Sequence, residues 1–131
     1  MARPAAETAR ANNEAFSRQD VEAMLELHRP DAVVADRREV GFGEFRGHDA
    51  IRSYYQGLFD NTAWIKEDLE VVSAEGNVAI ASCHVRAELA GQAGDPPAVT
   101  FDYALRIEVE GDLIATLEIY PDVASARGRG R

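Results

Sequence analysis

The C-terminal half of this chain alternates apolar and polar residues over four long stretches, and this pattern restricts the fold more than any other feature. An apolar residue at every second position is typical of a β-strand with one buried face. The pattern predicts strands over Ile65–Ser73, Val78–Leu89, Val99–Glu110 and Leu113–Tyr120. The connections are the turns Glu75-Gly76-Asn77 and Gly111-Asp112 and the longer loop Ala90–Ala98. We therefore expect four consecutive strands joined as antiparallel hairpins.

The N-terminal half instead repeats its apolar residues at helical spacing. A first helix has one face made of Ala5, Ala9, Asn12 and Phe16. A second helix, capped by Asp20 and ended by Pro30, has a face made of Val21, Met24, Leu25 and His28. A third has a face made of Ile51, Tyr54, Tyr55, Leu58 and Phe59. Three helices are thus expected before the main run of strands.

Two short segments lie between the second and third helices. The apolar run Ala32–Asp36 predicts a strand. Gly41–Gly47 invites comparison with a dinucleotide-binding loop, but its glycine spacing is one residue too long and Glu44 would lie among the phosphates. A flexible turn is the better interpretation.

Helices followed by strands predict an α+β fold, with the helices packed on one face of a curved antiparallel sheet. In the last two strands the face toward the helices is apolar: Tyr103, Leu105, Ile107, Val109, Leu113, Ala115, Leu117 and Ile119. The opposite face is polar and solvated, or forms a homodimer interface; its outward residues include His84, Arg86, Asp102 and Arg106. One domain over residues 1–123 accounts for the pattern, and residues 124–131 form a flexible Gly/Arg tail.

Charge and composition exclude several classes of function. The chain of 131 residues carries a net charge of −9, which repels phosphate backbones and argues against nucleic acid as a partner. It has no signal-like N-terminus and no apolar run long enough to span a membrane, so we expect a cytoplasmic protein. Its three histidines lack metal-ligand spacing, which argues against a metal site, and Cys83 is expected to be a small buried hydrophobe.

Five polar residues fall on faces that should be buried, and they are the candidates for chemistry: Asn12, His28, Asp36, Tyr55 and Tyr103. A buried carboxyl has a raised pKa, in the range useful to a general base. Each residue also has a structural alternative. Asp36 could pair with Arg37 or Arg38, and His28 could stabilise the end of its helix. The tyrosines could be core aromatics, and Asn12 could face solvent.

Four segments carry a resemblance to a known family: Arg18–Met24, Pro30–Asp36, Gly47–Ile51 and Glu110–Ile114. With the order of elements from about residue 5 to 122, they resemble the NTF2-like superfamily, in its SnoaL-like and ketosteroid-isomerase-like branch. The resemblance implies a cystatin/NTF2-like α+β cone. It places Asp36 where the isomerases have their general base, and Asn12 and Tyr103 where they have oxyanion donors. Ile119 stands where the epoxide hydrolases have an aspartate, so the resemblance does not extend to their chemistry.

The resulting hypothesis is an enzyme that needs no cofactor, of the isomerase, polyketide cyclase or dehydratase type, acting on a hydrophobic carbonyl-containing molecule. Asp36 would remove a proton next to the carbonyl, while Tyr103 and Asn12 would bind the enolate oxygen. The expected substrate-binding residues are Tyr55, His28, Phe16, Trp64, Leu105 and Ile119. The alternative is a non-catalytic ligand-binding or dimerisation module with the same fold, in which Asp36 is paired with an arginine.

Overall fold

A computed structural model describes residues 4–39, 41–90 and 99–128 of the chain. Over these residues the helices are α1 (Ala5–Ser17), α2 (Val21–Glu26), α3 (His48–Asp60) and α4 (Val123–Arg127). The strands are β1 (His28–Asp36), β2 (Gly43–Arg46), β3 (Thr62–Glu75), β4 (Val78–Leu89), β5 (Val99–Glu110) and β6 (Leu113–Tyr120). Most of the predicted loop Ala90–Ala98 lies outside the described residues.

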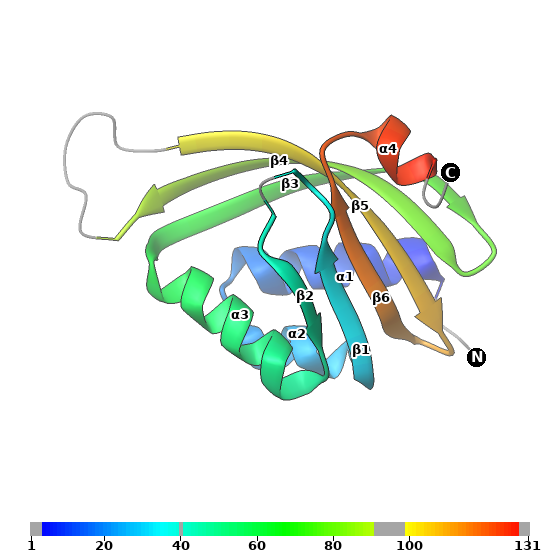
Figure 1. Cartoon of the computed structure of the whole chain (residues 1–131), viewed down its shortest axis with the longest axis horizontal. Coiled ribbons are helices and arrows are strands. Elements are labelled where there is room, and N and C mark those ends of the chain that lie inside the picture. Colours follow the sequence, from blue (N-terminus) through cyan, green and yellow to red (C-terminus); the bar gives the residue numbers. More distant parts are fainter. Residues whose placement is uncertain (1–3, 40, 91–98, 129–131) are drawn as a thin grey trace.

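The strands form one curved sheet in the order β2-β1-β6-β5-β4-β3, which wraps around α1 (Figure 1). Neighbouring strands are antiparallel except β1 and β6, which run parallel. The curved antiparallel sheet expected from the sequence is therefore a curved mixed sheet with one parallel pair. β1 precedes the β3–β6 meander along the chain, so its pairing partner depends on where the meander ends in space. The alternation within each strand does not indicate that position.

The three C-terminal strands have the predicted bounds, and β3 extends beyond both ends of its predicted range. The core-facing register of β6 differs from the prediction. An irregularity between Glu108 and Val109 pairs Val109 with Ile114, so Ile114 is buried while Leu113 and Ala115 are only partly so. Such a bulge shifts the side chains beyond it to the other face.

The predicted second helix ends earlier than the sequence indicated. Asp20 caps α2 as expected, its carboxylate accepting from the Ala23 N–H at 3.1 Å. The helix nevertheless stops at Glu26, so His28 and Pro30 fall in β1. Pro30 is accommodated there because it lies where the β1–β6 ladder shifts register, so its missing N–H interrupts no regular pairing.

Two segments predicted to be irregular form regular structure. Gly43–Arg46 is a strand paired with β1 at the edge of the sheet, not a flexible turn. The predicted flexible tail 124–131 is helical over residues 124–127, as part of α4. Ala126 of α4 packs with Ile80, Ala104 and Tyr120 on the convex face of the sheet. Part of the face expected to be solvated is therefore covered by the chain itself.

The main core lies between the concave face of the sheet and α1, α2 and α3. Cys83 is buried there, as predicted. Within the described ranges, no helix is long and apolar enough to cross a membrane.

Candidate functional site

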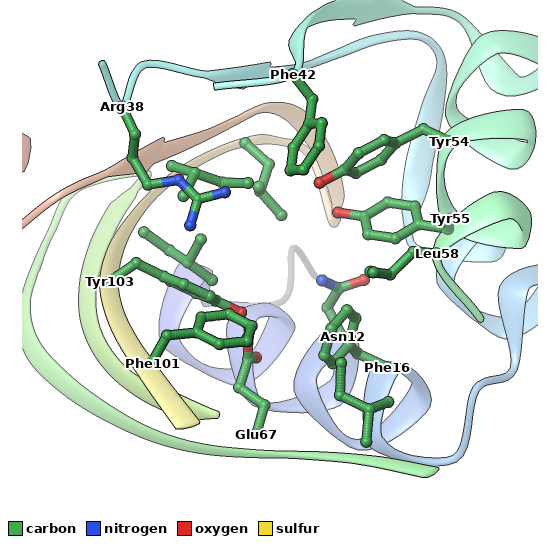
Figure 2. A pocket seen from close by; sticks show the side chains of 14 residues that line it. Asn12, Phe16, Arg38, Phe42, Tyr54, Tyr55, Leu58, Glu67, Phe101 and Tyr103 are labelled. Carbon is green, nitrogen blue, oxygen red and sulfur yellow. The ribbon is translucent and has the colours of Figure 1, made fainter. Parts of the chain in front are cut away.

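A pocket opens between α1, α3 and the concave face of the sheet (Figure 2). Its cavity volume is about 80 Å³, and it opens to solvent at its mouth. Six of the sequence-predicted residues line it: Asn12, Phe16, Tyr55, Tyr103, Leu105 and Ile119. The alternation and helical spacing thus placed these residues on the correct faces.

The interior carries a carboxyl group that the sequence analysis did not select, that of Glu67 on β3. Glu67 is only 5% exposed, and it accepts a hydrogen bond from the Tyr103 hydroxyl. Its backbone N–H donates to Ser17 Oγ at 3.1 Å, which ties this part of β3 to the end of α1. A signal was present in the sequence, because Glu67 has the same phase as Ile65 and Leu69 in an alternating strand.

Burial raises the pKa of Glu67 to about 7, while the Tyr103 hydrogen bond acts in the opposite direction. The pKa values of Tyr103 and Tyr55 are also raised well above 10, mainly by burial, so both phenols stay protonated. The Glu67 charge contributes to both, and burial with the same charge raises the pKa of the Cys83 thiol. Glu67 is thus the pocket group that changes charge near neutral pH.

Asn12 supplies an amide that has no complete set of partners. The residue is 4% exposed, and its Oδ1 is buried without a hydrogen-bond partner among the described residues. Figure 2 shows the amide at the pocket, beside Phe16 and below Tyr55. A buried polar atom without a partner is costly. In Figure 2 the amide nitrogen is the atom turned toward the pocket interior, so the N–H is the group that a ligand would meet.

Asp36, at the end of β1, is held by Arg38 in a two-point ion pair. Arg38 Nε lies 2.8 Å from Asp36 Oδ1, and Nη2 lies 2.7 Å from Oδ2. The backbone N–H groups of Arg38 and Phe42 also donate to this carboxylate, at 3.2 and 3.3 Å. Burial acts to raise the pKa of Asp36, but these hydrogen bonds and the Arg38 charge together lower it below its usual value.

The raised pKa expected for Asp36 is therefore wrong. Its pairing is the one that the sequence analysis gave for the non-catalytic alternative, with Arg38 as the partner. Arg37 instead pairs with Glu118, at 3.2 Å. Arg38 lines the pocket, whereas Asp36 does not. Asp36 therefore influences the pocket only indirectly, by positioning the guanidinium of Arg38.

Two predicted substrate-binding residues lie outside the pocket. Trp64 is on β3, one of the two edge strands, with 41% of its surface exposed. His28 is buried elsewhere, with Nδ1 2.7 Å from the Met24 carbonyl oxygen, close to the end of α2. Burial lowers the pKa of His28 to about 4, with a smaller contribution from His48, although the Met24 hydrogen bond opposes this. His28 thus lies close to the end of a helix, as the structural alternative held, and does not contribute to the pocket.

The remaining lining residues were missed because their placement depends on tertiary structure. Tyr54 and Leu58 come from α3, and Phe101 lies one alternation before Tyr103 on β5. Phe42 follows β1 and stands at the mouth, opposite Phe101 (Figure 2). Among the described residues, no group of three or more His, Cys, Asp or Glu side chains is arranged to hold a metal ion.

A six-stranded curved sheet around a helix is the NTF2-like, or cystatin-like, α+β fold, which solved structures share with this chain. The SnoaL-like domain matches residues 9–117, so the chain belongs to the SnoaL-like domain family. No curated protein sequence matches the chain.

Solved structures agree on the fold. An uncharacterised cystatin-fold protein of Novosphingobium aromaticivorans has a TM-score of 0.75 and 23% identity, covering 89% of this chain and 97% of its own. A hypothetical protein with a ketosteroid-isomerase-like fold from Catenulispora acidiphila, in complex with trimethylamine, has a TM-score of 0.76 and 15% identity, covering 94% and 91%. A proposed polyketide cyclase of Xanthomonas campestris pv. campestris has a TM-score of 0.73 and 21% identity, covering 93% and 96%. At such identities the likeness shows the fold alone.

Proposed function

We propose that the chain is an enzyme of the cyclase or isomerase type, in which Glu67 removes and returns a proton on a hydrophobic, carbonyl-containing molecule. The observation that carries the proposal is the buried carboxyl of Glu67, with a pKa of about 7, inside a pocket lined by aromatic side chains. A general base is most effective when its pKa lies near the working pH. The proposed cyclase activity of a structural relative supports the same reaction class.

The proposed step begins with the ionised Glu67. A C–H bond next to the substrate carbonyl breaks, its proton moves to a Glu67 carboxylate oxygen, and the electron pair forms an enolate. The Asn12 amide N–H binds the enolate oxygen, while the Tyr103 O–H holds the Glu67 carboxyl in place. In an isomerase, Glu67 returns the proton to another carbon. In a cyclase, the enolate carbon attacks a second carbonyl and Glu67 protonates the resulting alkoxide.

Asp36, the base expected from the sequence, takes a different role in this proposal. A carboxylate with a lowered pKa and a two-point arginine partner is a weak base. It holds Arg38 at the pocket wall. The closed Asp36–Arg38 pair is also the observation that favours the second candidate function, a non-catalytic module that binds a hydrophobic small molecule.

Exchange of α-hydrogens for deuterium separates these possibilities, because it reports proton removal without knowledge of the complete reaction. A panel of cyclic ketones and enones in D₂O is followed by NMR with the wild type, Glu67→Gln, Asp36→Asn and Glu70→Gln. Glu70 is an exposed residue on the same strand and makes a matched control. We expect exchange in the wild type and the Glu70 variant, at a rate that rises through pH 7, and loss of at least a hundredfold in Glu67→Gln.

Exchange at the wild-type rate in Glu67→Gln would refute Glu67 as the base. Complete loss in Asp36→Asn, with binding intact, would restore Asp36 to that role. Saturable ketone binding to the wild type without any exchange would establish the non-catalytic module.

A further inference from the structure

The guanidinium of Arg38 is fixed at the pocket wall with part of its hydrogen-bonding capacity unused. Asp36 takes up Nε and Nη2, and the Arg38 carbon Cζ lies 5.6 Å from the centre of the Tyr103 ring. Nη1 makes no hydrogen bond to any of the described residues. Figure 2 shows the guanidinium turned toward the pocket interior. The Asp36 ion pair and the Tyr103 ring therefore hold the guanidinium in place. Its Nη1 edge faces the space where a ligand would lie.

The chain closes tightly around this pair. A Cβ on Gly41 would lie 2.7 Å from the Asp36 carbonyl oxygen and 2.9 Å from its Cγ, so only glycine fits there. The Gly41 N–H donates to the Arg38 carbonyl oxygen at 3.0 Å. The loop that carries Arg38 is thus folded onto the carboxylate that orients it. A positioned guanidinium loses little conformational freedom when it binds an oxygen ligand.

The charged side chains of the pocket wall indicate which kind of ligand the Nη1 edge of Arg38 would bind. Arg38 and Glu67 are its only acidic or basic side chains among the described residues, apart from the protonated tyrosines. They contact the same side chain: Arg38 lies over the Tyr103 ring, and Glu67 accepts from the Tyr103 hydroxyl. A molecule that reached both would place an oxygen acceptor at Arg38 and its reacting carbon at Glu67, which contact the same tyrosine.

The mouth adds a preference for flat apolar molecules. Phe42 is 66% exposed and Phe101 is 39% exposed, and they flank the opening on either side of Arg38. A planar ring that stacks on exposed aromatic side chains removes their apolar surface from water, and this favours binding of such a ring at the mouth.

We infer that the substrate is a planar, ring-containing molecule with an anionic oxygen, a carboxylate or an ionised enol, which binds to Arg38 Nη1. This inference rests on the proposed function, because it orients the substrate toward Glu67. Arg38 is then the residue that selects charged from neutral ring molecules. Asp36 acts through Arg38 as a positioning residue.

Calorimetric titration of the full chain at pH 6 tests the inference, with four probes of similar size. Two carry an anionic oxygen, 2-naphthoate and 2-hydroxy-1,4-naphthoquinone; 2-naphthamide is neutral and 2-naphthylmethylammonium is cationic. We expect at least one anion to bind tenfold or more tightly than the amide. The anion that does so identifies the carboxylate or the ionised enol as the preferred group.

Variants assign the preference to Arg38. Arg38→Gln should abolish it, while Arg37→Gln, whose guanidinium pairs with Glu118, should retain it. Because Arg38→Gln leaves the Asp36 charge buried without its partner, the double variant Asp36→Asn/Arg38→Gln gives a neutral version of the pair. It should bind amide and carboxylate equally.

Equal binding of anion and amide by the wild type would overturn the inference and leave the pocket proposal standing. Tighter binding of the ammonium probe, or a preference for anions that survives in the double variant, would also overturn it. Failure of all four probes to bind would refute the pocket as a site for ring molecules, and the inference with it. Loss of deuterium exchange in Glu67→Gln is a separate observation, so the two proposals fail independently.

Discussion

Replacement of Glu67 by glutamine should change how the stability of the chain depends on pH. The side chain is buried, and its pKa is about 7 in the folded chain against an ordinary 4.5. The folded state therefore holds a proton between pH 4.5 and 7 that the unfolded state has released. By linkage, the contribution of Glu67 to stability is fully present below pH 4.5 and is lost as the pH rises through 7. The difference in pKa corresponds to about 3 kcal/mol.

A second buried group opposes this effect in the wild type. The pKa of His28 is about 4 in the folded chain against an ordinary 6.5, so its contribution is present above pH 6.5 and is lost as the pH falls toward 4. Between these limits the two groups act in opposite directions. The pH dependence of the stability of the wild type alone therefore does not separate the contribution of Glu67 from that of His28. A comparison of variants is needed.

Urea unfolding between pH 5 and pH 8 provides that comparison. From pH 5 to pH 8, the free energy of unfolding of Glu67→Gln should rise by about 2–3 kcal/mol relative to that of the wild type. Glu70→Gln, the same change at an exposed position of β3, should follow the wild type throughout. A constant difference between Glu67→Gln and the wild type would show that the Glu67 carboxyl is not desolvated in the folded chain. The central argument for its role as a base would then fail.

Three further predictions follow from single contacts. Asn12→Leu should stabilise the chain by about 1–2 kcal/mol in urea unfolding, since it removes a buried oxygen without a partner, and should reduce deuterium exchange. Unchanged exchange would exclude Asn12 from the reaction. Gly41→Ala should cost about 1–3 kcal/mol, because its Cβ would clash with Asp36, and should weaken binding of 2-naphthoate. Binding of 2-naphthoate should weaken as the pH rises through 7, when Glu67 ionises, but not in Glu67→Gln; a titration at pH 6 and 8 measures this.

Local pattern was sufficient for most of the fold and for six of the fourteen residues that line the pocket. Period-two alternation correctly predicted the bounds of β4, β5 and β6, and helical spacing placed Phe16 and Tyr55 on buried faces. Pairing between distant segments was not predictable in the same way. The parallel contact of β1 with β6, and the bulge that places Ile114 in the core, depend on tertiary packing.

At the site, too, local pattern indicated the candidate residues but did not decide their partners. Asp36 and Glu67 were both visible as carboxylates in phase with apolar neighbours, and burial alone would raise the pKa of each. Which of them keeps that raised pKa depends on its partners in space. Arg38 is two residues from Asp36, so this pair could be named as an alternative from the sequence. Tyr103 is 36 residues from Glu67, and nothing local indicates that they meet.

In the proposed function the two carboxylates have different roles, because their partners differ in charge. A cation beside Asp36 stabilises its ionised form, which makes it a permanent anchor and a poor proton acceptor. A neutral phenol beside Glu67 offers one hydrogen bond, which does not outweigh burial, so this carboxyl can release and regain a proton near neutral pH. Exchanging the partners would exchange the roles. A pocket that places an anchored cation and a proton-exchanging acid on either side of one tyrosine is suited to a substrate with an oxygen to be held and a neighbouring C–H bond to be broken.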